Sequence, residues 1–301
     1  MARPTPAQIK EVNVRYHDAA ATEYDSKWGI DYGLPGQAQV TGKLRKALGR
    51  EPGRYGRALE IGSGTGYFSL NLLRAGVIEA AVASDISPGM LDALSGTAAR
   101  LGLEVETACC EAAALPFGDD SFDLVFGHAV LHHLPDLDGA FAEFLRVLKP
   151  GGTLAFCGEP SRHGDRIATV PKRAALTAAP VWRRLVGASE KRNGHDPGDD
   201  HELEQFVDVH AFSPRDLAGF ARAAGFRDVR VRGEELAANW FGWFNRTCEA
   251  TAEPEEVPWA WRQYAYRGYL ALQAVDRALL EPRLPAALFY NLLVSARAPD
   301  C

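Results

Sequence analysis

A chain of 301 residues is long enough for one elaborated α/β domain with inserted segments, so two separate domains are not required. Its composition, 47% hydrophobic and 24% charged, is typical of a globular protein with a substantial core and excludes disorder as the default state. The formal net charge of −6 argues against a surface built to neutralise a phosphate backbone, so we expect no nucleic-acid partner.

The five cysteines, two of them adjacent at Cys109 and Cys110, form neither a disulfide framework nor a spaced metal-ligand pattern. We therefore expect reduced thiols and no bound metal. The N-terminus has no apolar signal core, and the longest apolar stretch, 284–294, is shorter than the ~20 residues of a membrane span. These features predict a cytoplasmic protein without a transmembrane segment.

The first half of the chain alternates between strand and helix patterns. Residues 1–50 are expected to form an N-terminal helical cap, and 51–160 a Rossmann-like core that holds a cofactor. Apolar runs bounded by glycine, proline or acidic residues predict strands over 57–61, 80–85, 103–109, 122–127 and 153–158. Helices are expected over 88–100 and 137–148. The alternation predicts parallel βαβ units in a doubly wound α/β sheet.

After residue 160 this rhythm is interrupted twice. Residues 161–211 are expected to form a charged helical insertion, with basic residues first and acidic ones later. Residues 212–233 return to the core with a helix capped by Ser213 and a strand over 229–231. A second helical insertion, rich in aromatic residues, follows over 234–286, and 287–301 offers a last strand and a tail.

The strongest chemical signal is a glycine turn after the first strand, in the segment ALEIGSGTGYFS. Small residues let a ligand lie against the main chain, and the helix that follows points its unpaired N–H groups at the same crevice. The turn residues are Gly62, Ser63, Gly64 and Gly66. Dinucleotide enzymes use the spacing GxGxxG, whereas Tyr67 stands here in place of the third glycine, which disfavours an NAD-dependent oxidoreductase.

Two acidic residues extend this interpretation. Glu60, just before the turn, is expected to place a carboxylate beside the crevice, which suits a cationic sulfonium or ammonium group better than a pyrophosphate. Asp85 ends the second strand, where it can accept hydrogen bonds from ribose hydroxyls, and Ile86 beside it can pack on an adenine face. Asp85 also has an alternative role as a helix cap, although Ser87 is the better cap.

These blocks resemble the class I S-adenosylmethionine-dependent methyltransferases, in particular the small-molecule branch that includes quinone and sterol methyltransferases. The segment SDISPGML, which contains Met90, resembles the family's second motif, and ALPFGDDSFDLVFGHAVLHHL and LRVLKPGGTLAF resemble later ones. The resemblance implies a seven-stranded, mostly parallel sheet with an antiparallel seventh strand. It also implies that Glu111 binds the adenine amine, that Ala112 offers its N–H to the ring, and that Cys110 flanks the pocket.

The family's architecture also implies where the acceptor binds. Tyr24 resembles an N-terminal tyrosine that caps the cofactor, and the loop carrying His128, His132 and His133 borders the acceptor. His128 is the preferred candidate for a general base, because an imidazole takes up a proton near neutral pH. We assign His133, Glu159, Trp240 and Trp243 to the acceptor pocket, although aromatic residues at helical spacing more often pack helices together.

The predicted function is methyl transfer from S-adenosylmethionine to a small molecule, with S-adenosylhomocysteine as the second product. An apolar or aromatic acceptor would suit the aromatic side chains of the second insertion. In-line displacement needs positioning and desolvation above all, and the sequence leaves oxygen, nitrogen, carbon and sulfur open as the nucleophile. A noncatalytic or repurposed binder of the same cofactor is the main alternative.

Overall fold

The structure, a computed structural model, describes residues 5–21, 30–191 and 210–300. The chain divides into two compact units. The first comprises Met1–Glu159, Asp200–Val231 and Leu293–Cys301, and the second comprises Pro160–Asp199 and Arg232–Leu292.

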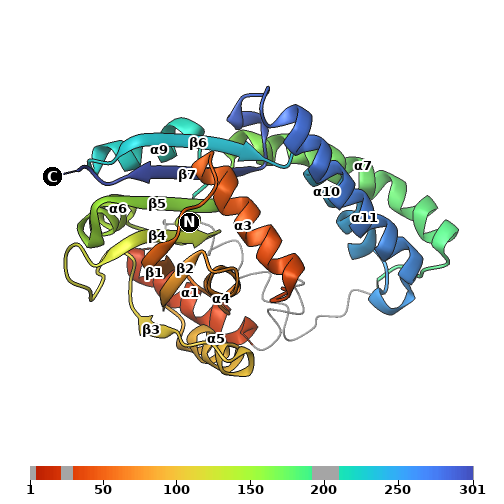
Figure 1. Cartoon of the computed structure of the whole chain (residues 1–301). Coiled ribbons are helices and arrows are strands. Elements are labelled where there is room, and N and C mark those ends of the chain that lie inside the picture. The colour runs from red at the N-terminus through yellow and green to blue at the C-terminus, as the bar shows by residue number, and fades with distance from the viewer. Residues whose placement is uncertain (1–4, 22–29, 192–209, 301) are drawn as a thin grey trace. The chain divides into compact units, whose positions relative to one another are not determined.

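A single sheet of seven strands, in the order β3-β2-β1-β4-β5-β7-β6, organises the fold (Figure 1). The strands are β1 (Tyr55–Ile61), β2 (Ile78–Asp85), β3 (Glu106–Cys109), β4 (Phe122–His128), β5 (Leu148–Pro160), β6 (Arg227–Glu234) and β7 (Asn291–Arg297). Strands β1 to β5 pair in parallel. Because β1 lies between β2 and β4, the chain leaves it in one direction and later returns on its other side, which places the switch point of the sheet at β1.

The seventh strand runs antiparallel to β5. Gly151 N donates to Pro299 O at 3.2 Å and Ala298 N donates to Gly152 O at 2.9 Å, so the residues that follow β7 lie beside the start of β5. Figure 1 also shows the arrows of β6 and β7 pointing in opposite directions. The predicted seven-stranded, mostly parallel α/β sheet is confirmed.

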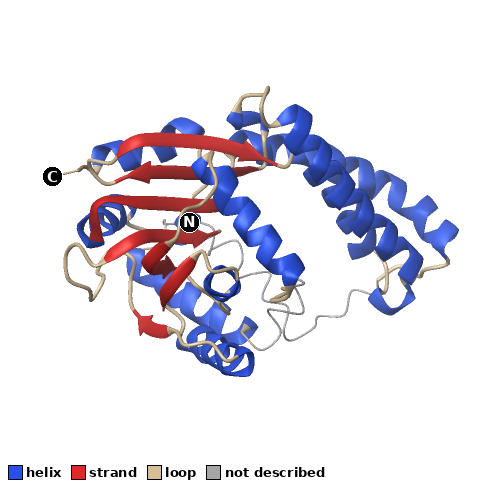
Figure 2. Ribbon diagram, in the orientation of Figure 1, coloured by secondary structure: helices blue, strands red, loops and turns tan. Residues whose placement is uncertain are grey.

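Helices cover the sheet on both faces (Figure 2). In the first unit these are α1 (Pro6–Ala20), α3 (Leu34–Leu48), α4 (Tyr67–Arg74), α5 (Pro88–Leu101), α6 (Leu137–Val147) and α9 (Pro214–Ala223), with a short 3₁₀ turn, η1 (Leu131–His133). Ala155 and Cys157 of β5 belong to a core cluster with side chains of α3 and α4. Phe156, between them, contacts Phe144 of α6 with ring centroids 5.2 Å apart, so α6 lies on the opposite face.

Several predicted boundaries differ from the structure by one to five residues; the largest difference is at β5, which was expected over 153–158 and extends over Leu148–Pro160. The strand expected over 103–109 begins only at Glu106, because α5 runs to Leu101 and Gly102, in the left-handed region with φ 67°, ends it. The helix expected over 137–148 ends at Val147, and Leu148 already belongs to β5.

The described part of the second unit is mainly helical and also includes the last residue of β5, the end of β6 and the start of β7. It contains α7 (Arg162–Val186), α10 (Ala237–Ala250), α11 (Trp259–Val275), the 3₁₀ turns η2 (Pro254–Glu256) and η4 (Ala286–Leu288), and the π-helical turn η3 (Asp276–Leu280). Aromatic contacts join the three long helices. Trp182 of α7 meets Trp261 of α11 at 5.3 Å between centroids, and Phe241 of α10 meets Tyr264 of α11 at 5.5 Å.

Asp276 is fully buried and caps α10, since Ala237 N and Ala238 N donate to its two carboxylate oxygens at 3.0 and 2.9 Å.

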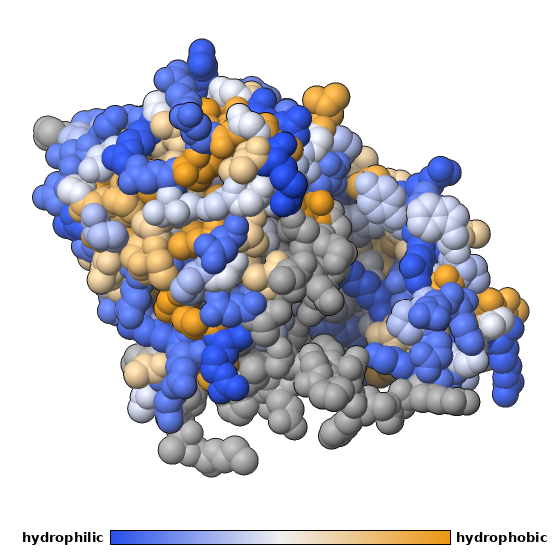
Figure 3. Space-filling model, turned by 90° about the horizontal axis from the view of Figure 1, so that it is seen from below, coloured by the Kyte–Doolittle hydropathy of each residue, from blue (hydrophilic) through white to orange (hydrophobic). Residues whose placement is uncertain are grey.

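Within the described part of the chain, no helix is long and apolar enough to cross a membrane. On the face drawn in Figure 3, hydrophilic side chains are mixed with smaller groups of hydrophobic ones.

Candidate functional site

A cavity of about 330 Å³ opens at the carboxyl ends of β1, β2 and β4, and the first unit alone lines it. This is the switch point of the sheet, where doubly wound folds bind their ligands. The lining residues are Lys10, Asn13, His17, Ile61, Gly62, Gly64, Ser84, Asp85, Ile86, Met90, Cys110, Glu111, Ala112, Ala113, His128, Ala129, Val130, His133, Leu134, Pro135 and Asp136.

The glycine turn forms the floor of this cavity in a conformation that requires glycine. Gly62, Gly64 and Gly66 have φ values of 62°, 50° and 88°, in the left-handed region. A Cβ at Gly62 would lie 2.3 Å from a methyl carbon of Val130, whereas a Cβ at Gly64 would meet nothing within 4 Å. The space above Gly64 is therefore open to a ligand. Ser63 and Gly66 do not line the cavity; the buried Ser63 Oγ has no hydrogen-bond partner among the residues described.

Asp85 joins the end of β2 to the glycine turn. Gly64 N donates to its Oδ2 at 2.8 Å and Ser87 N to its Oδ1 at 2.9 Å, while Ser87 itself caps α5 through Met90 N. Burial raises the pKa of Asp85, and the hydrogen bonds from Ser87 and Gly64 and the charge of His17 act in the opposite direction. Each carboxylate oxygen still has a lone pair for a ligand donor.

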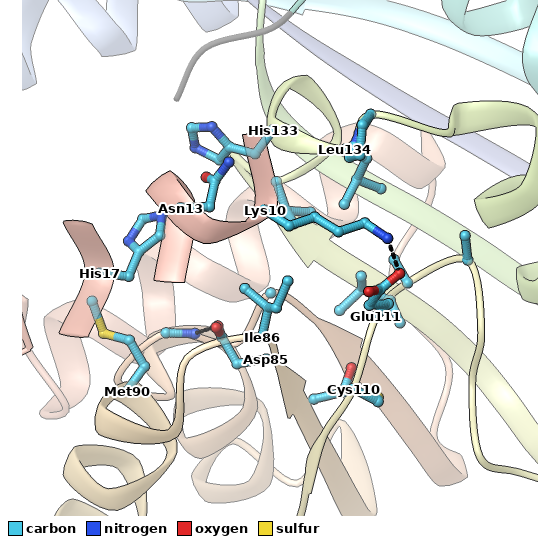
Figure 4. A pocket seen from close by; sticks show the side chains of 18 of the residues that line it. Lys10, Asn13, His17, Asp85, Ile86, Met90, Cys110, Glu111, His133 and Leu134 are labelled. Atoms are coloured by element: carbon cyan, nitrogen blue, oxygen red, sulfur yellow. Dashed lines mark hydrogen bonds and ion pairs between the residues drawn. The ribbon is translucent and has the colours of Figure 1, made fainter. Parts of the chain in front are cut away.

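The far end of the cavity follows β3. Cys110, Glu111 and Ala112 line it, and Glu111 forms an ion pair with Lys10 of α1 (Figure 4). Burial raises the pKa of Cys110 to about 11, so its side chain is a neutral thiol at physiological pH.

His128 ends β4 and lines the cavity from the other side. Its ring stacks on Phe68 of α4, with centroids 4.7 Å apart and planes 22° from parallel. A Cβ at Gly158 would lie 2.8 Å from His128 Nε2, so the neighbouring strand leaves just enough room for the imidazole. Ala129, the next residue, has a φ of 53°, an unfavourable value for a residue with a Cβ, which marks this turn as strained.

A buried carboxylate holds that turn together. Glu159 at the end of β5 is fully buried, and Val130 N and Leu131 N both donate to its Oε1 at 3.0 Å. His132 N donates to Oε2 at 3.1 Å, and His132 Nδ1 lies 2.9 Å from the same oxygen. Glu159 is not among the cavity-lining residues; it supports the turn that is.

Three imidazoles contact one another in sequence beside the cavity. His133 lines the cavity and packs against His132, with centroids 3.9 Å apart, and against His17 of α1 at 5.7 Å. His132 is mostly buried behind His133, next to Glu159. His133 and His132 together therefore connect the cavity wall to the buried carboxylate of Glu159.

The structure places Glu60 away from the cavity wall, contrary to the expectation from the sequence. Side chains alternate along a strand, and the next residue, Ile61, is the one that lines the cavity. Glu60 accepts hydrogen bonds from Ser69 N at 3.0 Å and from Ser69 Oγ, and so satisfies the start of α4, where Gly66 has no side chain to do so. Burial raises its pKa to about 8.

The remaining predicted residues lie elsewhere. Tyr24 is outside the described residues. Trp240 and Trp243 belong to α10 of the second unit, where Trp240 is 39% exposed and Trp243 packs between Lys172 and Tyr290. Their assignment to the acceptor stays a prediction.

Helix α1 contributes residues that the sequence analysis missed. Lys10, Asn13 and His17 all line the cavity, and their spacing of three and then four positions places them on one face of the helix. This spacing was the available signal, but polar residues on a helix normally face water. Among the residues that the structure describes, no group of three or more histidine, cysteine or acidic side chains is arranged to hold a metal ion.

Comparison with known proteins identifies the family. Residues 59–156 match the model of a family described as a methyltransferase domain. A demethylmenaquinone methyltransferase of Roseiflexus castenholzii is 33% identical over 238 residues, which are 78% of this chain and 93% of that protein. A malonyl-[acyl-carrier protein] O-methyltransferase of Halorhodospira halophila is 29% identical over 294 residues, 95% of this chain and 81% of that protein.

Among solved structures, phosphoethanolamine N-methyltransferase 2 of Haemonchus contortus, in complex with S-adenosyl-L-methionine, has a similar fold. Its TM-score is 0.59 at 17% identity, with 97% of this chain and 60% of that chain covered. The fold, the site at its switch point and the relative of 33% identity together show that the chain belongs to the class I S-adenosylmethionine-dependent methyltransferases that act on small molecules.

Proposed function

We propose that the enzyme binds S-adenosylmethionine in the cavity of the first unit and methylates the oxygen of a hydroxyl or enol on a small molecule, with His128 as proton acceptor. One observation carries this proposal: a single cavity combines the glycine turn, two carboxylates at or just after the ends of neighbouring strands, and three imidazoles.

The residues present fit the cofactor. The open space above Gly64 admits a group against the main chain, and the lone pairs of Asp85 and Glu111 suit the hydroxyls and the amine of a nucleoside. Ile86 and Met90 add apolar surface to the cavity lining. When bound, S-adenosylmethionine supplies a methyl group on a positively charged sulfur, an electrophile for a nucleophile held in line with it.

The charges around the cavity favour a neutral or anionic acceptor over an ammonium. Asp85 accepts two backbone hydrogen bonds, Glu111 pairs with Lys10, and Asp136 accepts from Gly139 N as the cap of α6. These carboxylates already accept hydrogen bonds or pair with a cation, and the lone pairs that remain on Asp85 and Glu111 suit the cofactor. The other titratable side chains that line the cavity include three imidazoles, those of His17, His128 and His133. A cationic acceptor finds little compensation there.

The relatives named above act on different acceptors according to their names, demethylmenaquinone in one case and malonyl-[acyl-carrier protein] in the other. Both names are compatible with an acceptor that is not a cation. A neutral hydroxyl or enol is an acceptor of this kind that needs a base, and His128 offers one, so we place the acceptor of this enzyme among hydroxyl and enol compounds.

The chain's own contribution to the chemistry is positioning, desolvation and proton removal. Helix α1 lies against the cavity through Lys10 and His17 and so limits the access of water. His128, held between Phe68 and Gly158, is the group that takes the proton from the acceptor oxygen as the oxygen forms its bond to the methyl carbon. Because bound S-adenosylmethionine would leave as a neutral thioether, the chain would not need to supply an acid.

Incubation of the enzyme with methyl-¹³C-labelled cofactor and a small-molecule cell extract tests the proposal. Mass spectrometry locates the labelled product, and its ¹³C shift separates O-methyl from N-, S- and C-methyl groups. We expect an O-methyl product. An N-methyl product would overturn the acceptor class, and cofactor binding without label transfer in many extracts would favour a noncatalytic binder.

Once the acceptor is known, the role of His128 has its own test. We expect His128→Gln to lower kcat by about 100-fold and to remove the rise of kcat with pH. His163→Gln, a change of an exposed histidine on α7, is the matched control. A His128→Gln enzyme with normal kcat and pH profile would leave only positioning and desolvation.

A further inference from the structure

The N-terminal helix α1 is fastened along the cavity at both ends. Thr5 and Gln8 form a capping box that begins it. Lys10 pairs with Glu111, and at the other end the Asp18 carboxylate accepts from Gly89 N at 3.0 Å and from Ser87 Oγ. The helix therefore runs along the cavity from the residues after β3 to the start of α5.

The same face of α1 spans the distance between the two carboxylates that suit a nucleoside. Lys10 reaches Glu111, and His17 lies close enough to Asp85 for its charge to act on that carboxylate. Asn13 stands between Lys10 and His17 and also lines the cavity (Figure 4). Its position is thus over the stretch from Glu111 to Asp85.

The side chain of Asn13 has an acceptor that nothing in the described chain satisfies. The residue is only 5% exposed, and its Nδ2 donates to Ile9 O at 2.9 Å. That bond fixes the orientation of the amide, because the opposite one would set Oδ1 against a carbonyl oxygen. Oδ1 is then the free atom, buried and without a hydrogen-bond partner among the described residues. Such a group is costly unless a ligand or a water satisfies it.

We infer that Asn13 is a cofactor-binding residue, whose Oδ1 accepts a hydrogen bond from a hydroxyl or amine of the bound nucleoside. This inference rests on the proposed placement of the cofactor in the cavity. It makes α1 part of the binding site, with the glycine turn on one side of the nucleoside and an amide of the N-terminal helix on the other.

Calorimetric titration with S-adenosylhomocysteine tests it with the full chain. Asn13→Leu has a similar size and no acceptor, and we expect its affinity to fall about tenfold, as the loss of one buried hydrogen bond implies. The melting temperature of the ligand-free variant should stay the same or rise, because an unsatisfied polar atom has been removed. A purely structural role for Asn13 predicts a lower melting temperature and unchanged affinity.

Asn245→Leu is the matched control. Asn245 of α10 also donates Nδ2 to a carbonyl four residues earlier and also has a buried, unpartnered Oδ1 among the described residues, but it lies outside the cavity. We expect its affinity for S-adenosylhomocysteine to equal that of the wild type. If Asn13→Leu does not fold, Asn13→Ala serves for the same measurement.

Ligand analogues identify the donor. Ribose-deoxy analogues of S-adenosylhomocysteine, and the inosine analogue, which lacks the exocyclic amine, each remove one nucleoside donor. For the donor that meets Asn13, the loss of affinity seen in the wild type should vanish in Asn13→Leu. If the wild type and Asn13→Leu bind S-adenosylhomocysteine with equal affinity, this inference alone is overturned. That result is expected if a water, and not the ligand, satisfies Asn13 Oδ1, or if Oδ1 stays without a partner. Failure of the wild type to bind overturns the proposed cofactor site as well.

Discussion

Replacing the buried carboxylate of Glu159 probes the support of the cavity wall. Its two oxygens accept hydrogen bonds from the backbone N–H groups of Val130, Leu131 and His132. The fourth hydrogen bond joins one of these oxygens to His132 Nδ1. Glu159→Gln keeps the shape but turns one oxygen into an NH₂ group, which can only donate. The variant therefore measures what two accepting oxygens contribute.

The structure suggests which arrangement of the amide costs least. The NH₂ group can face His132 and donate to Nδ1 of its ring, provided that the ring proton is on Nε2. In that arrangement only the backbone N–H of His132 loses its partner. An unsatisfied buried donor costs about 1–3 kcal/mol, so we expect the free energy of unfolding to fall by about 2 kcal/mol. Glu159→Ala leaves all four donors without an acceptor and should cost about 4 kcal/mol or more.

Urea unfolding followed by far-UV circular dichroism measures these differences, and Glu79→Gln is the control. Glu79 on β2 has a half-exposed side chain, paired with Arg54 at the surface, and its loss should change stability by less than about 0.5 kcal/mol. Because Val130 and His133 line the cavity, Glu159→Gln should also weaken S-adenosylhomocysteine binding several-fold. Wild-type stability and wild-type binding in Glu159→Gln would refute the reasoning.

Three further predictions concern other parts of the first unit. Gly64→Val should reduce S-adenosylhomocysteine affinity at least about 100-fold in calorimetry, because the side chain enters the open space and disfavours a φ of 50°; unchanged affinity would place the ligand elsewhere. Burial raises the pKa of Glu60 to about 8, so the folded state retains a proton that the unfolded state releases near pH 4.5. Stability should therefore decline as pH rises between these values, by up to about 1.4 kcal/mol per pH unit; Glu60→Gln should abolish that slope in urea titrations, and an equal slope in the variant would contradict the assignment. Arg146→Ala removes hydrogen bonds to the carbonyls of Leu115 and Phe117 and should lower the free energy of unfolding by about 2 kcal/mol. A variant with the wild-type free energy of unfolding in urea titrations would contradict this prediction.

Local sequence rules predicted the parts of the site that depend on neighbouring residues. The glycine turn needs a left-handed backbone conformation at Gly62 and Gly64, and glycine is the residue type that adopts this conformation without strain. Asp85 ends a buried strand and Ser87 caps the next helix, so both positions follow from the chain order. The period of two along β1 should also have shown that Glu60 and Ile61 face opposite sides.

Residues that depend on tertiary packing were beyond such rules. The contribution of Asn13 requires knowing that α1 packs along the cavity, which Asp18 and its contacts at α5 determine. The role of Glu159 requires knowing that the end of β5 lies beside the turn after β4.

Helix α7 illustrates the same limit in the second unit. Pro171 and Pro180 lie inside it, although each removes a backbone hydrogen bond and normally ends a helix. Burial of one face, with Ala175, Ala179 and Trp182 packed inward, offsets that cost. A local rule for proline does not include this packing.

Titration of the wild type and of Asp85→Ala with S-adenosylhomocysteine, with NAD as a comparison ligand, tests the central claim most directly. We predict that the wild type binds one S-adenosylhomocysteine per chain and no NAD, and that Asp85→Ala binds at least about tenfold more weakly, since a charged group contributes more than one ordinary hydrogen bond. Binding of NAD in place of S-adenosylhomocysteine, or S-adenosylhomocysteine binding that is indifferent to the loss of Asp85, would contradict a methyl-donor site in this cavity.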